Sequence, residues 1–290
     1  MSSSRLRPAT EGDAEQVAAL FRATFPTWRW FVTTEDILSW LRDPEIGDRT
    51  RVLEIEGRVV GYGDVTAGQD MELDVVAPGH WDPFLDWLEE RARESDLTYA
   101  RVGFPEGHEL QDVAAARGYT QWRSAHTMEI ALAEPPEAVL PDGIDIRPYS
   151  DDVADTLRDG MNEAFAQDPF WHVVTAENFR TGYSGNQSSS PELWLLAWAG
   201  QELAGFVLPE PTRGSDKELG WVRVLGVRPR WRRQGLGEAL LRQAFRELYD
   251  LGRRRVGLGV DGENPTGAVA LYERVGMRRV SSIDNWRKAV

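Results

Sequence analysis

The 290-residue sequence predicts a mixed α/β protein in which one fold occurs twice. Its length favours two domains of about 145 residues, because a single hydrophobic core rarely grows to the size of the whole chain. Its composition, with 41% hydrophobic and 28% charged residues, is typical of a folded globular protein. A third observation is an internal repeat, because the pattern of the first half returns 140 residues later.

The two copies begin with the same local pattern. Arg7-Pro8 opens the first copy and Arg147-Pro148 opens the second. Residues 55–62 and 197–206 later predict, in each copy, two strands around a tight turn. Between these features, each copy has apolar residues at the spacing of one helix face, namely Ala14, Val17 and Phe21 in the first and Ala154, Leu157 and Met161 in the second.

Prolines and a glycine mark the join between the copies. Pro135, Pro136, Pro141 and Gly143 interrupt any periodic pattern, which is typical of a linker. We therefore predict an N-terminal domain at residues 1–132, a linker at 133–143 and a C-terminal domain at 144–290.

Periodicity and turn residues predict the elements of the second copy in order. A helical apolar face comes first, short apolar runs then indicate strands, and a long helical pattern follows a pair of glycines. A further strand, a helix and a hairpin complete the copy. The predicted helices are 151–165, 236–251 and 265–275, the strands are 193–198, 203–209, 218–227 and 255–260, and the closing hairpin is 278–290.

Charge and composition exclude several classes of function. The net charge of -14 and pI near 4.8 argue against binding to nucleic acid or to an anionic membrane, and favour a cationic substrate. Residues 1–140 hold 13 basic and 26 acidic residues, whereas residues 141–290 hold 20 and 21, so the acidity belongs to the first half. Without cysteine, the chain has no disulfide, thiolate metal site or cysteine nucleophile.

The N-terminus lacks the apolar stretch of a signal peptide, and the longest apolar runs, such as 193–199, are too short to span a membrane. We therefore expect a cytoplasmic protein that binds neither membrane nor nucleic acid, as a monomer or a homodimer.

One segment of the second half has the pattern of an anion site. The strand Trp221–Val227 runs into a loop with Gly235 and Gly237, and a helix follows at once. Free backbone N–H groups and the positive end of the helix dipole favour a phosphate at such a helix start. The same segment concentrates positive charge, with Arg223, Arg228, Arg230, Arg232 and Arg233.

These residues carry a family resemblance. The spacing Val227-x-Pro229-x-x-Arg232-x-x-Gly235-x-Gly237 resembles the acyl-CoA-binding signature of the GNAT superfamily of N-acyltransferases. A second motif of that family resembles the segment with Asn264, Ala268, Leu271-Tyr272-Glu273 and Gly276. The tandem arrangement is most similar to mycothiol synthase and related two-lobed acetyltransferases. The resemblance implies two tandem GNAT folds, each a mixed β-sheet flanked by helices, with a degenerate first copy and a catalytic second copy.

The resemblance also implies a reaction and its donor. It predicts an N-acetyltransferase that moves an acetyl group from acetyl-CoA to a primary amine of a small cationic acceptor by direct attack, without a metal. The expected donor contacts are the backbone of Leu225, Gly226 and Val227 for the acyl group and pantetheine arm, and Asn264 for the pantetheine. The pyrophosphate is expected at the N–H groups of Arg233, Gln234, Gly235, Leu236, Gly237 and Glu238, with charge from Arg232 and Arg233.

Three residues are predicted to take part in catalysis. The Leu225 N–H is expected to stabilise the oxyanion and Tyr272 to protonate the leaving thiolate. Glu218 is a candidate general base through a bridging water, with His172 and Asp261 as alternatives. Mycothiol synthases have a carboxylate after the Leu-Gly pair of this strand, where the present chain has Trp221. Aromatic residues that could line an acceptor site are Phe170, Trp171, Trp198 and Trp221.

The first copy lacks these features. Trp81 stands where the motif needs an arginine, Pro83 removes an N–H group, and Ala114 replaces the tyrosine. Asp82 and Asp86 would repel a diphosphate. We therefore predict that the first copy neither binds CoA nor catalyses.

Other functions remain open from the residues alone. A non-catalytic acyl-CoA sensor or partner-binding module would keep the loop without a base, and a protein N-acetyltransferase would share the donor site. Residues 257–262 also match the dinucleotide fingerprint G-x-G-x-x-G, but these glycines fall inside a predicted strand rather than between a strand and a helix.

Overall fold

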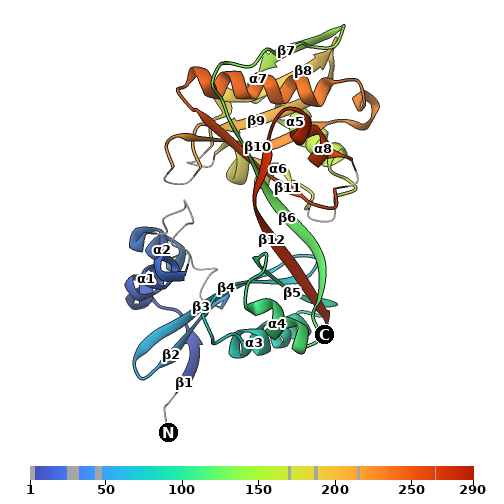
Figure 1. Cartoon of the computed structure of the whole chain (residues 1–290). Helices are drawn as coiled ribbons and strands as arrows, with labels where there is room; N and C mark the ends of the chain where they lie inside the picture. Colours follow the sequence, from blue (N-terminus) through green and yellow to red (C-terminus); the bar gives the residue numbers. More distant parts are fainter. Residues whose placement is uncertain are drawn as a thin grey trace. The chain divides into compact units, whose positions relative to one another are not determined.

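The computed structural model describes residues 4–24, 33–42, 48–168, 171–185, 189–213, 216–264 and 266–290. The chain forms two compact units, each a β-sheet with helices on both faces (Figure 1). Unit 1 comprises Met1–Ala125 and Ser282–Val290, and unit 2 comprises His126–Ser281.

Unit 1 contains a mixed sheet whose strands follow the order β1-β2-β3-β4-β5-β12-β6. The pairs β1–β2, β2–β3, β3–β4 and β5–β12 are antiparallel, and the pair β4–β5 is parallel. The strands that lie wholly in this unit are β1 (Ser4–Pro8), β2 (Thr50–Ile55), β3 (Arg58–Ala67), β4 (Met71–Val76) and β5 (Tyr99–Pro105), and the helices are α1 (Ala14–Thr24), α2 (Thr34–Leu41), α3 (Asp82–Glu94) and α4 (Leu110–Ala116).

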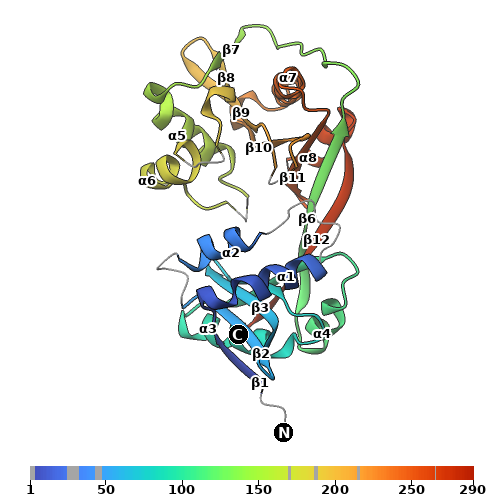
Figure 2. The same cartoon turned by 90° about the vertical axis from the view of Figure 1, so that its left-hand side faces the viewer.

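The helices of unit 1 cover opposite faces of its sheet (Figure 2). On one face, α1 and α2 pack on β2 and β3 through buried Val17, Ile37 and Tyr62. On the other face, α3 packs through buried side chains that include Phe84 and Leu88. Each face of the sheet therefore has its own apolar core.

Unit 2 repeats this plan with the order β7-β8-β9-β10-β11-β6. Helices α5 and α6 pack on one face of the sheet and α7 on the other. The strands that lie wholly in this unit are β7 (Ile144–Pro148), β8 (Leu195–Ala199), β9 (Glu202–Glu210), β10 (Leu219–Val227) and β11 (Arg255–Asp261), and the helices are α5 (Ala154–Ala164), α6 (Ala176–Phe179), α7 (Leu236–Asp250) and α8 (Ala268–Arg274).

The internal repeat is confirmed at the level of single elements. A 3₁₀ turn at residues 11–13 precedes α1, and the matching turn at 151–153 precedes α5, at the expected offset of 140 residues. The predicted hairpins are β2–β3 and β8–β9. Their turns use the left-handed backbone of Gly57 (φ 77°) and Gly200 (φ 64°), which glycine adopts without steric cost.

The last strand of each copy departs from the prediction. Residues 278–290 do not form a hairpin, because Arg278–Ala289 is one continuous strand, β12. The end of β12 pairs antiparallel with β5, from Ile283 opposite Pro105 to Ala289 opposite Tyr99. The first copy ends in β6 (Thr120–Ala131), which neighbours both β12 and β11. Each unit is thus completed by a strand from the other copy.

This exchange separates the compact units from the predicted domain boundaries. The first segment of unit 1 ends at Ala125, within β6, and its second segment begins at Ser282. Local sequence patterns instead predict domain boundaries at 132 and 144. The physical reason is that the partner of β12 lies about 180 residues away in the sequence, where no local pattern indicates it. Residues 133–143, all described, contain no helix or strand and lie within unit 2.

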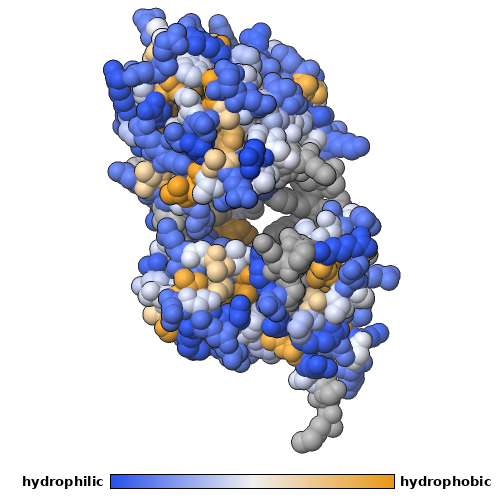
Figure 3. Space-filling view, turned by 180° about the vertical axis from the view of Figure 1, so that it is seen from behind, coloured by the Kyte–Doolittle hydropathy of each residue, from blue (hydrophilic) through white to orange (hydrophobic). Residues whose placement is uncertain are grey.

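The surface is largely polar. Figure 3 shows hydrophilic residues over most of the face in view. Among the residues that the structure describes, the large apolar side chains that are exposed belong to separate elements and loops, namely Trp40, Val139, Val173, Leu251 and Val280. No described helix is both long enough and apolar enough to cross a membrane.

Replacing Trp286 by Ala should destabilise unit 1, although the residue belongs to the second copy. Trp286 is 9% exposed and packs in the core of α3 and β5, so the substitution should cost about 3–5 kcal/mol of unfolding free energy. Denaturant unfolding with hydrogen–deuterium exchange should show the lost protection in β5. Val280→Ala, on the same strand at 54% exposure, is the control, and equal effects of the two variants would contradict the prediction.

Candidate active site

The site begins where two parallel strands part. β10 pairs with β11 only from Leu219 opposite Arg255 to Val222 opposite Leu258. On its other side, β10 stays paired with β9 as far as Val227, with a register shift between Val222 and Val224. Such a shift is a β-bulge, which bends a strand and re-aims its side chains. After Val222, one edge of β10 therefore lacks a neighbouring strand.

Leu225 and Val227 direct their backbone groups to this open edge. The N–H of Arg228 donates to the carbonyl of Ala204 on β9, at 3.0 Å. Because backbone groups alternate along a strand, those of Leu225 and Val227 face away from β9. The Val227 carbonyl accordingly accepts from Arg232 Nε, at 3.0 Å. The Leu225 N–H thus points to the open edge, and its predicted role as an oxyanion donor stays a prediction.

Gly226 has a steric reason for being glycine. A Cβ on this residue would lie 2.2 Å from Cζ of Phe206 on β9. The absent side chain lets the Phe206 ring pack directly on the β10 backbone. Gly226 thereby lets β10 pack closely against Phe206, which belongs to the apolar core beneath α5.

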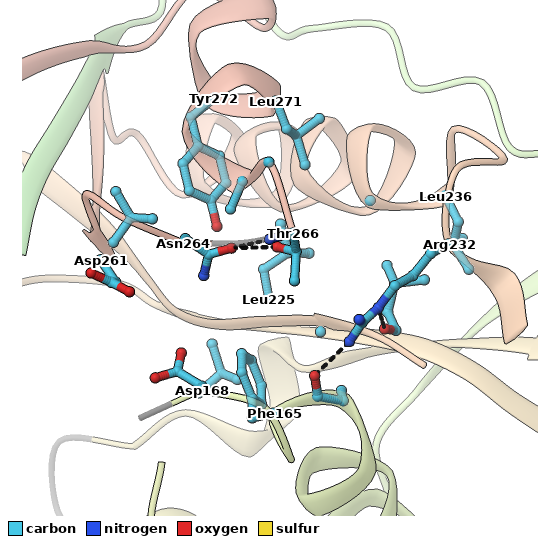
Figure 4. Close-up of a pocket in the computed structure, with 18 of the residues that line it drawn as sticks. Phe165, Asp168, Leu225, Arg232, Leu236, Asp261, Asn264, Thr266, Leu271 and Tyr272 are labelled. Carbon is cyan, nitrogen blue, oxygen red and sulfur yellow. Dashed lines mark hydrogen bonds between the residues drawn. The ribbon is translucent and has the colours of Figure 1, made fainter. Parts of the chain in front are cut away.

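A cavity of about 1130 Å³ lies along the open edge. The end of α5 and the loop after it form one wall, and the end of β11 with α8 forms another (Figure 4). The loop between β10 and α7 closes one end. The cavity therefore joins the free strand edge to the start of a helix.

That loop presents six free N–H groups. Among the described residues, no backbone N–H from Arg233 to Glu238 donates to another backbone group, and the first bond of α7 runs from Ala239 to the Gly235 carbonyl. Arg233 (φ 63°) and Gly235 (φ 82°) have left-handed backbones, which turn successive N–H groups toward one point. Together with the helix dipole, this concave set of donors fits a phosphate or diphosphate.

Only one arginine of this region is left for the anion. The guanidinium of Arg233 has no hydrogen-bond or ion-pair partner in the described part of the chain, and an ideal Cβ on Gly267 would lie 4.0 Å from its Nη1. The other arginines contact protein groups: Arg223 contacts Glu210 and the Gly182 carbonyl, Arg228 contacts Glu163, Arg230 contacts Glu202, and Arg232 contacts the carbonyls of Val227 and Ala164.

Tyr272 and Asn264 line the cavity from the side of α8 (Figure 4). Tyr272 is 7% exposed, and its hydroxyl points into the cavity without a hydrogen-bond partner among the described residues. Burial raises the pKa of this hydroxyl to about 12, so it stays protonated. The Asn264 Oδ1 accepts from the backbone N–H of Thr266, at 2.9 Å, and from its hydroxyl, so only Nδ2 remains to donate.

The remaining predicted residues separate into two groups. Leu236, Gly237, Glu238 and Asp261 line the cavity. Three others do not: Glu218 is exposed in the turn directly before β10, His172 is exposed in the loop after α5, and the Gln234 side chain turns back to the Arg230 carbonyl. Of the aromatic candidates, Trp171 lines the cavity, Trp198 and Trp221 do not, and Phe170 lies outside the described residues.

The end of α5 is a wall that the sequence did not indicate. Phe165 lines the cavity and stacks on Trp171, with ring centroids 4.5 Å apart. Asn162 holds this loop, because its Oδ1 accepts from Trp171 Nε1 and from the N–H of Val174. The sequence indicates Trp171 as a possible acceptor contact, but no pattern in it indicates Phe165 or Asn162.

The dinucleotide fingerprint has a packing explanation. Gly257 and Gly259 lie inside β11, not at a turn into a helix. A Cβ on Gly257 would lie 2.8 Å from the ring of Trp221 on β10. The contact between the two strands therefore explains Gly257, whereas a Cβ on Gly259 would meet no atom closer than 4.0 Å.

In unit 1 the corresponding loop is occupied by the chain itself. Trp81 is buried, and its indole N–H donates to Glu109 Oε1, at 3.2 Å. The Gly79 N–H donates to the same oxygen, also at 3.2 Å. The His108 ring packs edge-on against Trp81. A carboxylate of the protein thus takes the backbone donor that an anionic ligand would use.

Comparisons with known proteins agree with this geometry. The Acetyltransferase (GNAT) family matches residues 151–277. A mycothiol acetyltransferase of Geodermatophilus obscurus is 34% identical over 261 residues, covering 81% of this chain and 80% of the relative. One from Catenulispora acidiphila is 34% identical over 217 residues, covering 72% and 68%.

Two solved structures share the fold over nearly the whole chain. A GCN5-related N-acetyltransferase from Sphaerobacter thermophilus has a TM-score of 0.79 at 27% identity, covering 99% of this chain and 95% of that one. A tandem GNAT protein from the clavulanic acid biosynthesis pathway has a TM-score of 0.71 at 17% identity, covering 99% and 98%. The predicted fold class, α/β with tandem GNAT folds, is confirmed.

The fold and the cavity define an acyltransferase, in a class whose members take the acyl group from acetyl-CoA. The chain belongs to the GNAT acetyltransferase family and is an enzyme of that type. Within the family, relatives that it matches over most of their length are mycothiol acetyltransferases.

Replacing Arg233 by Gln should weaken acetyl-CoA binding about tenfold, because a charge-assisted contact to phosphate is lost from a site with no other unpaired arginine in the described loop. Calorimetric titration should show the effect shrinking at high salt, since Arg233 is exposed. Arg230→Gln removes the same charge from the same loop and is the control. Equal losses in both variants would mean that net charge alone matters.

Proposed function

We propose that the protein transfers an acetyl group from acetyl-CoA to a primary amine of a small cationic acceptor, in the cavity of unit 2. One observation carries this proposal: the open edge of β10 leads directly into the cluster of N–H groups at the start of α7. The first can pair with an amide-containing arm and the second with a pyrophosphate. Acetyl-CoA carries both groups, because its amide-containing pantetheine arm is joined directly to the pyrophosphate.

The residues along the cavity support direct attack. The amine nitrogen bonds to the thioester carbon, the C–S bond breaks, and the sulfur leaves as a thiolate that takes up a proton. The Leu225 N–H faces the position where the oxyanion develops. The protonated Tyr272 hydroxyl, aimed into the cavity, donates to the thiolate. Asn264 Nδ2 donates to a pantetheine carbonyl.

Asp261 is the general base that we propose for the acceptor ammonium. Of the three candidates from the sequence, Asp261 alone lines the cavity, at the end of β11 where the strands part. Glu218 lies in the turn before β10, about 20 Å from Leu225 along the chain direction of the strand. We therefore leave Glu218 and His172 out of the proposed mechanism.

The acceptor side of the cavity supports a cationic molecule. Asp168 and Asp261 bring carboxylates to its lining, and the Phe165–Trp171 stack brings aromatic faces that suit a cation or a sugar ring. The relatives named mycothiol acetyltransferases make deacetylated mycothiol one acceptor to test. Trp221, which replaces the carboxylate expected of that family, lies under the Arg213 guanidinium, 4.5 Å from the ring centroid.

An amine panel tests the proposal directly. The full-length protein is incubated with acetyl-CoA and polyamines, amino sugars, aminoglycosides, amino acid derivatives or deacetylated mycothiol, and both free thiol and acetylated product are measured. We expect product with one or more cationic amines and one acetyl-CoA per chain by calorimetry. Binding without any product would support the non-catalytic sensor, and acetylation of peptides alone would support a protein N-acetyltransferase.

Replacing Tyr272 by Phe should lower kcat about 10²-fold and leave the acetyl-CoA affinity nearly unchanged, because the hydroxyl acts on the leaving group. Since the pKa of Tyr272 is about 12, its ionisation should not limit the wild-type rate between pH 7 and 10. Steady-state kinetics across that range measures both effects. An unchanged kcat in the variant would remove Tyr272 from the mechanism.

A further inference from the structure

Arg232 lies in the loop between β10 and α7, residues 228–235, which we call the donor loop because it is the proposed site of acetyl-CoA. Its side chain bridges β10 and α5. Its Nε donates to the Val227 carbonyl at the end of β10, at 3.0 Å. Its Nη2 donates to the Ala164 carbonyl at the end of α5, at 2.6 Å. The family motif places this arginine in the acyl-CoA loop, yet both of these donors are used within the protein (Figure 4).

The Ala164 carbonyl is a favourable partner for a cation. It is the last residue of α5, and the final carbonyls of a helix have no partner within the helix. They also carry the negative end of the helix dipole, which attracts a guanidinium. A hydrogen bond from a charged donor is stronger than one between neutral groups. Arg232 therefore fixes the end of α5 rather than merely touching it.

What Arg232 fixes is one wall of the cavity. The residues directly after Ala164, from Phe165 to Asp168, line the cavity on the side where Trp171 stacks on Phe165. A second arginine from the same loop supports this wall, because Arg228 pairs with Glu163 at 2.6 Å. Arg228 and Arg232, both in the donor loop, thus connect this loop to the end of α5.

We propose that Arg232 is a positioning residue that holds the α5 wall against the donor loop and thereby sets the affinity for the acceptor amine. This inference rests on the proposed transfer reaction and assigns Arg232 to the acceptor rather than to the pyrophosphate. Arg233, the neighbouring residue, lines the cavity and keeps its guanidinium available for the anion. Two adjacent arginines of one motif then serve different substrates.

A lysine cannot replace this bridge. Two nitrogens of one planar guanidinium reach two carbonyls at once, whereas an ammonium is a single point of charge on a flexible stem. We expect Arg232→Gln to raise the acceptor KM about tenfold and to lower kcat, because small displacements of a substrate-positioning wall are costly. For Arg232→Lys, the acceptor KM and kcat should lie between those of the wild type and of Arg232→Gln. The acetyl-CoA Kd should change less than about twofold in either variant.

The experiment compares Arg232→Gln, Arg232→Lys and the control Arg230→Gln, which removes a charge from a surface pair whose two side chains are 73% and 57% exposed. Calorimetry gives the acetyl-CoA Kd of each full-length variant. Hydrogen–deuterium exchange follows residues 161–168. Steady-state kinetics uses the best amine of the panel.

Faster exchange in 161–168 and a raised acceptor KM, in the Arg232 variants but not in Arg230→Gln, support the proposal. A loss of acetyl-CoA affinity as large as in Arg233→Gln, with exchange in 161–168 unchanged, overturns it and makes Arg232 a phosphate ligand. If no amine is acetylated, the proposed reaction fails, while exchange and calorimetry still decide what Arg232 holds.

Discussion

The parting of β10 and β11 after Val222 is the constraint on which the site depends. An unpaired strand edge inside a protein leaves N–H and C=O groups that need partners. Arg232 satisfies one of them, the Val227 carbonyl, and the backbone of Leu225 is left toward the cavity. A third strand at this edge would satisfy the backbone and remove the site. The unpaired edge therefore costs stability and provides the surface for a ligand.

Local chemistry was predictable from the sequence, and distant pairing was not. The loop with Gly235 and Gly237 is recognisable because its conformation depends on adjacent residues. The partner of Arg232 is the Ala164 carbonyl, 68 residues earlier, and no side-chain pattern indicates a backbone oxygen. The exchange of β6 and β12 is similar, since a strand pattern does not specify its neighbour. The strand pattern that makes Glu218 a candidate base does not show that this residue lies in the turn before β10, away from the cavity.

The loops before α7 and α3 differ in what contacts their backbone donors. In unit 2, Gly235 precedes α7, and the N–H groups from Arg233 to Glu238 have no backbone acceptor among the described residues. In unit 1, Trp81 stands at the start of α3, and Glu109 accepts from its indole and from the Gly79 backbone. Because this carboxylate belongs to the chain, it occupies the donor without the loss of translational entropy that an external anion pays on binding. Residues 1–140 hold 26 acidic and 13 basic residues, and this negative charge further disfavours the binding of a polyanion.

Burial at Tyr272 shapes the last step of the proposed reaction in two ways. A tyrosine with a pKa of about 12 is a weaker acid than a thiol, whose ordinary pKa is about 8.5, so in water the proton would stay on the tyrosine. The thiolate, however, forms in the same apolar surroundings, and burial raises its pKa as well. Desolvation therefore makes the Tyr272 hydroxyl a weaker acid and the departing thiolate a stronger base. A short hydrogen bond between them lowers the energy of the departing sulfur before the proton moves, and this requires only that Tyr272 be protonated, which its burial ensures.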